Sequence, residues 1–166
     1  NPVLGVLVGM VFTAVIQSSS ASVGILQALA LTGSVSFGAA IPIIMGQNIG
    51  TCITALISSI GVSRSAKRVA VVHVSFNVIG TAVCMVLFYG ANALVGFTFL
   101  DDPIGVVGIA LCHSAFNIFT TALLLPFSRQ LEKLARRLVR SESRKENFAF
   151  LDPLLLRTPG VAISEC

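Results

Sequence analysis

The residues with the clearest chemical potential form one short polar run, Gln17-Ser18-Ser19-Ser20-Ala21-Ser22. The run supplies an amide and four hydroxyl groups, and it lies in a stretch, 1–63, that contains no Asp, Glu, Lys, Arg or His. Unsatisfied polar groups at membrane depth cost several kcal/mol, roughly 4–8 in the least forgiving solvents. Such a cluster is therefore usually buried in protein or lines a cavity. Because hydroxyls and amides bind small ions, we interpret this run as a transport site.

The composition indicates an integral membrane protein. Of the 166 residues, 55% are hydrophobic and 11% are charged, whereas about 25% are charged in a soluble domain. Seven of the eleven Lys and Arg residues lie between positions 129 and 145, so the net charge of +4 belongs to loops and tail. This distribution does not indicate a nucleic-acid partner. A basic tail beside a membrane segment indicates which side of the membrane the tail lies on, and it indicates contact with the anionic lipid of the bilayer.

Two apolar segments, 69–89 and 104–126, are long enough to cross a membrane as helices, since a helix needs about 20 residues to cross a bilayer. Basic residues precede the first segment and follow the second, while Asp101 and Asp102 lie between them. The positive-inside rule predicts that the basic loops and the C-terminus are cytoplasmic and that Asp101 and Asp102 are outside. We expect a multi-pass protein of the plasma membrane.

The apolar segments 2–16 and 23–31 are too short to span, and the polar run lies between them. A helix of about 15 residues covers about 22 Å, less than the ~30 Å hydrocarbon core. The stretch is either one continuous helix over 2–31 with a polar middle, or two half-helices that form a re-entrant hairpin with the serines at its tip. We favour the hairpin.

The next apolar segment, 36–60, is also interrupted, by Pro42 and by the motif Gly46-Gln47-Asn48-Ile49-Gly50-Thr51. Proline and glycine weaken a helix at the point where Gln and Asn occur. Interrupted hydrophobic segments of this kind point to a transporter's binding site. The glycine spacing is also the GxxxG helix-packing motif, which explains the glycines but not the two amides.

The two motifs suit ions of opposite charge. The polar run and the free amide groups at the start of the returning half-helix suit an anion, whereas the oxygens of Gln47, Asn48 and Thr51 suit sodium. No apolar segment carries Asp, Glu, Lys or Arg. Each bound ion would therefore neutralise the other, which favours coupled transport. We see no cysteine or histidine spacing typical of a metal site, and we expect no cofactor besides sodium as the coupling ion.

A second polar pattern, His73-x-x-Phe76-Asn77, recurs forty residues later as His113-x-x-Phe116-Asn117. On an antiparallel pair of spans, Asn77 and Asn117 would both lie near the membrane midplane. Their amides would either form interhelical hydrogen bonds, worth about 0.6 kcal/mol on average, or contribute to an ion site. We therefore add Asn77 to the sodium candidates.

The QSSS run, the GQNIGT motif and the HxxFN segment, in this order, resemble the signatures of the sodium-dependent phosphate cotransporter family, type II and its bacterial relatives. The resemblance covers about residues 1–128. It implies two inverted repeats, each with a QSSS run, that bind phosphate where they meet. This chain has one such run, so it would be one repeat whose partner repeat is missing. The resemblance assigns phosphate to Gln17, Ser18, Ser19 and Ser20, and makes sodium contacts plausible at Gln47, Asn48 and Thr51.

We therefore predict an all-α integral membrane protein, half of an inverted-repeat transporter. It would contain a re-entrant hairpin and a broken helix followed by two transmembrane helices. Residues 1–128 would be the transporter repeat, 129–147 a basic amphipathic cytoplasmic helix along the membrane surface, and 148–166 a linker or the start of a further cytoplasmic domain.

The predicted function is sodium-coupled symport of inorganic phosphate. The alternatives are a carrier of another oxyanion and a non-transporting membrane regulator of phosphate signalling. An intramembrane serine hydrolase is disfavoured because three adjacent serines suit multidentate binding better than one positioned nucleophile. We do not expect an enzyme.

Overall fold

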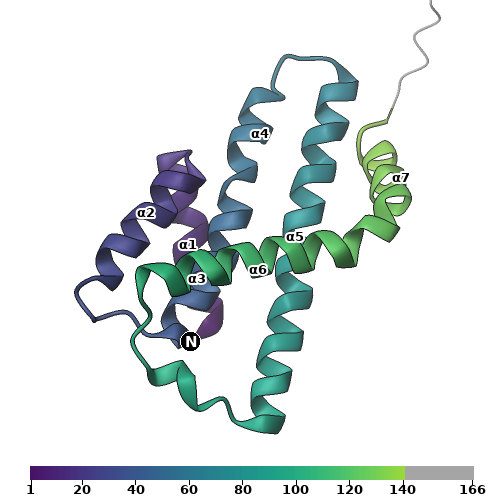
Figure 1. The fold of residues 1–166 in the computed structure, drawn as a ribbon. Coiled ribbons are helices and arrows are strands. Elements are labelled where there is room, and N and C mark those ends of the chain that lie inside the picture. The colour runs from purple at the N-terminus through teal and green to yellow at the C-terminus, as the bar shows by residue number, and fades with distance from the viewer. Residues whose placement is uncertain (141–166) are drawn as a thin grey trace, which may run out of the picture.

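A computed structural model describes residues 1–140, and the regular structure of this part is helical (Figure 1). The elements are α1 (Pro2–Ile16), α2 (Ser19–Ala30), α3 (Phe37–Gly50), α4 (Cys52–Ser58), α5 (Arg64–Val95), η1 (Thr98–Asp101), α6 (Val106–Leu124), η2 (Leu125–Phe127) and α7 (Ser128–Leu138). Three helical stretches are long and apolar enough to cross a membrane: Phe37–Ser58, Arg64–Val95 and Val106–Leu138. The prediction of an all-α membrane protein is confirmed.

The first two helices form a hairpin, so the continuous-helix alternative is wrong. Helix α1 ends at Gln17, whose φ of 57° lies in the left-handed region. Ser18 is extended and caps α2, because its Oγ accepts a hydrogen bond from the Ala21 amide at 3.3 Å. Serine is among the best N-cap residues, and a left-handed residue ends a helix effectively. The chain therefore reverses at the polar run.

Helices α1 and α3 pack backbone against backbone. A methyl group added at Gly9 would collide with the carbonyl oxygen of Ile43, and one added at Gly46 would collide with the carbonyl oxygen of Val6. Four glycines at GxxxG spacing on the two helices make this approach possible: Gly5, Gly9, Gly46 and Gly50. The glycines of the second motif thus serve helix packing.

The predicted break in the second apolar segment is mild and lies at Thr51. Helix α3 continues through Pro42 and both glycines to Gly50, and Thr51 itself has nearly helical angles, φ −63° and ψ −23°. The carbonyl oxygen of Asn48 accepts from the Thr51 hydroxyl at 2.6 Å. Because the helix is almost continuous here, the motif can offer a bound ion its side-chain oxygens but few free backbone carbonyls.

Both predicted spans are helical, but they are not arranged as an antiparallel pair. Helix α6 runs across α5 instead of alongside it (Figure 1). The helices meet where Gly80 leaves room for the side chain of Thr120, whose hydroxyl lies 3.6 Å from the sulfur of Cys84. The loop before α6 is also tied to the turn before α3, because the Ile104 amide donates to the Val35 carbonyl at 2.8 Å. This tie fixes the start of α6 beside α2 and directs it across α5.

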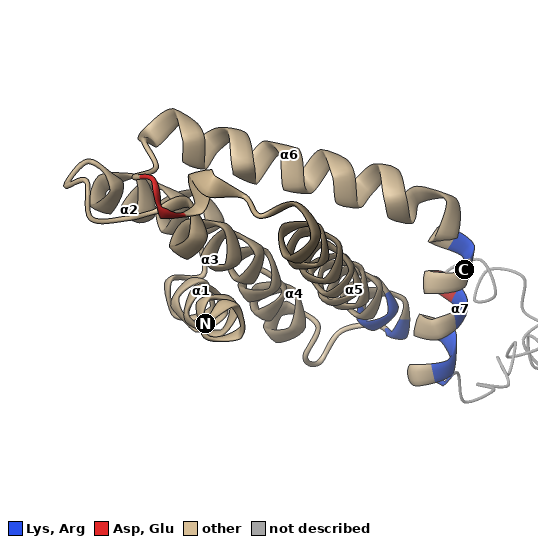
Figure 2. Cartoon of the chain, turned by 90° about the horizontal axis from the view of Figure 1, so that it is seen from below, with Lys and Arg blue, Asp and Glu red and all other residues tan. Residues whose placement is uncertain are grey.

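The basic amphipathic helix is shorter than predicted, since α7 ends at Leu138, and residues 141–166 lie outside the described part of the chain. Helix α7 buries Leu131 and Ala135 and packs on α5. The guanidinium of Arg68 donates to the Val139 carbonyl at 3.2 Å. Lys and Arg gather at this end of the molecule, opposite the acidic segment beside η1 (Figure 2).

We expect Gly9→Ala to destabilise the protein, because its methyl group would push α1 away from α3. Overpacking of this kind typically costs about 1–3 kcal/mol. The measurement is thermal unfolding of the full-length protein in detergent. The matched control is Gly90→Ala in α5, whose methyl group would meet no described atom within 4 Å. Equal losses in the two variants would contradict the packing argument.

Candidate anion and sodium site

The hairpin tip presents hydrogen-bond donors at one point. Ser19 and Ser20 are the first two residues of α2, and their backbone amides have no partner within the helix. The hydroxyl oxygens of Ser18 and Ser20 are 3.3 Å apart. Gln17, Ser19 and Ser20 are exposed, and Ser18 is half-buried. With the partial positive charge of a helix N-terminus, this arrangement suits an oxyanion.

A buried polar network connects the hairpin to α3. The hydroxyl groups of Thr13 and Ser22 are 2.7 Å apart, and both residues are fully buried. The Gln47 side chain donates from Nε2 to the Ser22 hydroxyl at 2.9 Å and to the Ser22 carbonyl at 3.1 Å. The QSSS segment and the GQNIGT motif, which lie far apart in the sequence, are thus joined through Ser22 and Gln47.

The side-chain oxygen of Gln47 is buried and has no hydrogen-bond partner within residues 1–140. The residue as a whole is 1% exposed. Most buried polar side-chain atoms in proteins have at least one partner, so an unpaired one needs an explanation. An amide oxygen is a suitable ligand for a hard cation such as sodium.

The other three sodium candidates lie around Cys52. The Cys52 sulfur is 3.7 Å from the carbonyl oxygens of both Asn48 and His73. The Asn77 amide donates to the same His73 carbonyl at 3.0 Å, and the Thr51 hydroxyl donates to Asn48. Asn48, Asn77 and Thr51 therefore form a group where α4 meets α5. Thr51 also connects this group to Gln47, because its backbone amide donates to the Gln47 carbonyl at 3.2 Å.

The repeated His–Phe–Asn pattern has a local explanation. Asn117 donates from its side chain to the His113 carbonyl at 2.8 Å, as Asn77 does to His73. Each amide thus bonds to the carbonyl four residues earlier in its own helix. Interhelical hydrogen bonds, one of the two alternatives for these amides, are therefore not what their nitrogens form.

Thr13 is a residue of this network that the sequence analysis overlooked. It is the one polar side chain between positions 2 and 16, and this isolation was the signal that could have revealed it. Elsewhere, the Thr81 hydroxyl donates to the Met45 carbonyl at 3.3 Å and ties α5 to α3.

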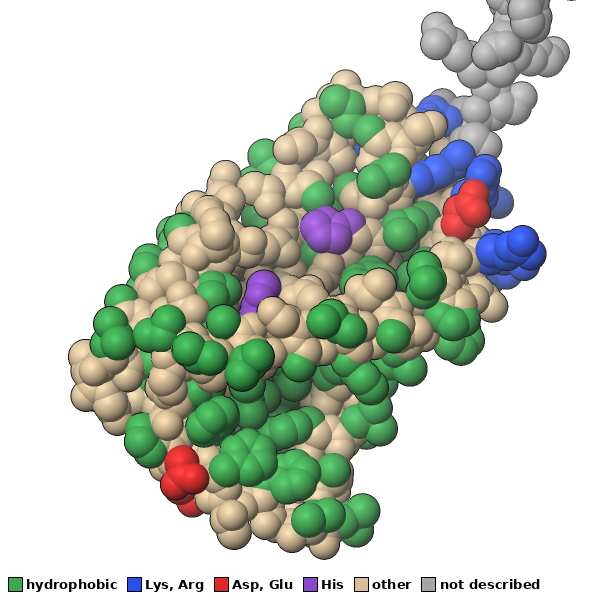
Figure 3. Space-filling view, viewed as in Figure 1, with side chains coloured by type: hydrophobic (Ala, Val, Ile, Leu, Met, Phe, Trp, Pro, Cys, Tyr) green, Lys and Arg blue, Asp and Glu red, His purple; other side chains and the backbone are tan. Residues whose placement is uncertain are grey.

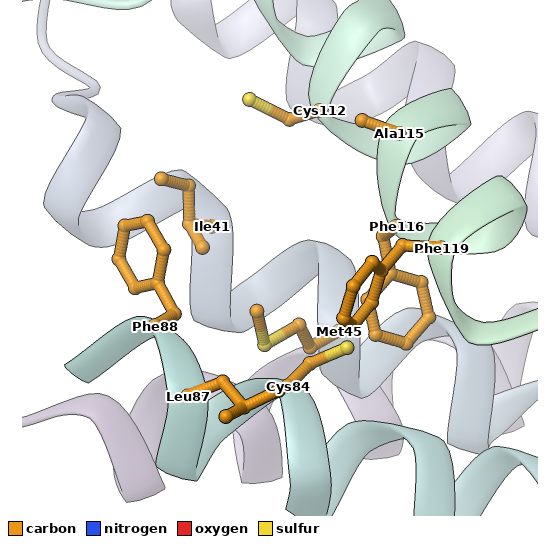
Figure 4. A pocket seen from close by; sticks show the side chains of 9 residues that line it. All are labelled: Ile41, Met45, Cys84, Leu87, Phe88, Cys112, Ala115, Phe116 and Phe119. Atoms are coloured by element: carbon orange, nitrogen blue, oxygen red, sulfur yellow. The ribbon is translucent and has the colours of Figure 1, made fainter. Parts of the chain in front are cut away.

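A pocket of about 450 Å³ between α3, α5 and α6 is not a candidate ion site (Figure 4). The side chains that line it include Ile41, Met45, Phe88, Phe116 and Phe119. Because such apolar and aromatic groups cannot replace the hydration shell of phosphate or sodium, the polar hairpin remains the candidate site.

The described residues thus combine three helical stretches able to cross a membrane with a hydroxyl-rich hairpin tip. The sequence profile of the Na+/Pi-cotransporter family matches residues 1–107, and the chain belongs to this family. It is a family of transporters and not of enzymes.

Three relatives illustrate the similarity. The chain is 36% identical over 133 residues to "Uncharacterized protein YqeW" of Bacillus subtilis. The aligned region covers 80% of this chain and 42% of that protein. It is 25% identical over 164 residues to "Putative inorganic phosphate export protein YjbB" of Salmonella typhimurium, an alignment that covers 97% of this chain and 30% of that protein. It is 39% identical over 93 residues to "Sodium-dependent phosphate transport protein 2A" of Rattus norvegicus, an alignment that covers 52% of this chain and 15% of that protein. The chain thus spans less than half the length of these relatives. No solved structure matches it.

We expect Thr13→Val to lower stability, because it removes one hydroxyl from the buried network without changing the side chain's size. The loss should be about 1 kcal/mol, measured as thermal unfolding of the full-length protein. Thr121→Val replaces an exposed threonine on α6 and serves as the control. A Thr13 variant as stable as this control would show that the hydrogen bond between Thr13 and Ser22 does not hold the two arms of the hairpin together.

Proposed function

We propose that the full-length protein carries inorganic phosphate across the plasma membrane together with sodium. The observation that carries this proposal is the unpaired, buried oxygen of Gln47, which Ser22 links to the donor-rich hairpin tip. Membership of the Na+/Pi-cotransporter family and the printed name of the rat relative support the same substrates.

Phosphate would bind at the start of α2. The backbone amides of Ser19 and Ser20 and the hydroxyls of Ser18, Ser19 and Ser20 are donors that suit its oxygens, and the Gln17 amide adds another. These residues are exposed or half-buried in the described chain. We infer that a second repeat of the same protein covers the tip and completes the site, since this chain spans 42% of the Bacillus relative.

Sodium would bind at Gln47, with Asn48, Thr51 and Asn77 as a second candidate group. Residues 1–63 carry no charged side chain, so neither ion finds a counter-charge in the hairpin or in α3 and α4. Desolvating an ion without a counter-charge is very costly. Binding sodium and phosphate together reduces this cost for both, which provides a physical basis for coupling.

The two repeats would alternate access by moving against each other around the bound ions. We place the basic end of the molecule in the cytoplasm and Asp101 and Asp102 outside, following the positive-inside rule. Transport of another oxyanion is the second candidate, because hydroxyl and amide donors do not select phosphate by themselves. The name of the Salmonella relative specifies export, so the direction of phosphate transport has to be measured as well.

The test is radiolabelled phosphate uptake by the full-length protein in proteoliposomes, with sodium or potassium outside. Replacing Ser18, Ser19 and Ser20 by alanine should lower sodium-dependent uptake by about tenfold or more, since a hydrogen bond to a charged group contributes about 1.5–3 kcal/mol. Thr32→Ala with Ser34→Ala removes two exposed hydroxyls at the other end of α2 and is the control. Uptake that is equal in both salts would contradict coupling, and uptake that survives the serine replacements would contradict the site.

Gln47→Leu tests the sodium assignment separately. We expect the sodium concentration for half-maximal uptake to rise by about tenfold, because one oxygen ligand is lost together with the two hydrogen bonds that Gln47 donates to Ser22. Gln27→Leu is the matched control, since Gln27 donates to the Val106 carbonyl, away from the hairpin tip. A sodium dependence that is unchanged by Gln47→Leu would exclude Gln47 as a ligand.

A further inference from the structure

Helices α5, α6 and α7 enclose an apolar groove at the basic end of the molecule. Its volume is about 390 Å³, and its walls include Ile79 and Val83 of α5, Leu123 of α6, and Leu131 and Leu134 of α7. None of the residues that line the groove belongs to the candidate ion site, although one sodium candidate, Asn77, also lies on α5. Figure 3 shows hydrophobic side chains directly beside the Lys and Arg cluster.

Basic side chains of α7 lie along the same face as the groove. Gln130 and Leu134 both line it. At 3.6 residues per turn, Arg137 falls on the face that these two residues define, and Lys133 falls next to it. Arg137 and Lys133 are exposed. They can therefore reach a charged group that is attached to an apolar chain in the groove.

Arg136 differs from its neighbour Arg137, although both are exposed arginines. The helical period places Arg136 on the other side of α7. There it forms an ion pair with Glu132 at 2.6 Å. The two arginines thus provide a matched pair, one beside the groove and one away from it.

Two of the helices that line the groove carry a large excess of basic residues. Within α5 and residues 128–140 there are eight basic residues and one acidic residue, Glu132. The Arg68 guanidinium binds the last turn of α7 through the Val139 carbonyl, so the basic helix is held against α5. This charge excess selects an anionic ligand over a zwitterionic or neutral one.

We propose that the groove binds an anionic phospholipid. One acyl chain lies between α5, α6 and α7, and the phosphate and headgroup contact Arg137 and Lys133. The long basic side chains pack their methylene groups beside the apolar wall and direct their charges to the headgroup. The occupant is a lipid and not free phosphate, because the groove itself is apolar and the basic groups lie at its edge.

The experiment compares lipid retention by the full-length protein in nanodiscs that contain equal amounts of phosphatidylglycerol and phosphatidylcholine. Bound lipids are counted by native mass spectrometry. The wild-type protein should retain phosphatidylglycerol severalfold over phosphatidylcholine. Arg137→Gln should lower this preference by about fivefold, since a basic residue near an anionic surface contributes about 1 kcal/mol. Arg136→Gln should leave the preference unchanged.

A second variant tests the groove without changing charge. Leu134→Trp fills the groove, so it should reduce the retention of both lipids while every basic residue remains. Equal effects of Arg136→Gln and Arg137→Gln would overturn the proposal in favour of diffuse surface attraction. A wild-type protein without lipid preference, full retention by the Leu134 variant, or displacement of the lipid by millimolar inorganic phosphate would also overturn it.

Discussion

Four glycines let the backbones of α1 and α3 touch, and this contact determines where the hairpin tip lies. A methyl group added at Gly9, Gly46 or Gly50 meets a main-chain carbonyl, which cannot move aside as a flexible side chain can. Because α1 is held this closely, Thr13 faces Ser22 across the hairpin, and Ser22 meets Gln47 of α3. The positions of the tip and of the buried amide therefore follow from helix packing.

The absence of charged side chains from residues 1–63 has a functional consequence. A fixed carboxylate or guanidinium beside the tip would bind one ion tightly and would resist its release. Neutral donors and acceptors instead require the two transported ions to neutralise each other. In the proposed mechanism, affinity for phosphate thus depends on bound sodium, and the linkage is reciprocal.

Local patterns predicted the elements well, and contacts between distant residues escaped prediction. The hairpin followed from a polar run between two short apolar segments, and Ser18 is the N-cap residue that such a turn favours. The course of α6 depends on Gly80 facing Thr120 and on a backbone bond between Ile104 and Val35, which no local pattern reveals. Gln47 was identified from its helix-weakening neighbours, but its partner Ser22 lies 25 residues away. The sequence therefore indicated the residue types of the site but not the hydrogen bonds that join them.

The most direct test of the central claim is a cryo-EM structure of the full-length protein with sodium and phosphate bound. The account predicts anion density within hydrogen-bond distance of the Ser19 and Ser20 amide nitrogens, and ion density beside the side-chain oxygen of Gln47. It also predicts that a second repeat covers the tip. Phosphate density elsewhere, with the start of α2 packed against protein or lipid, would contradict the account.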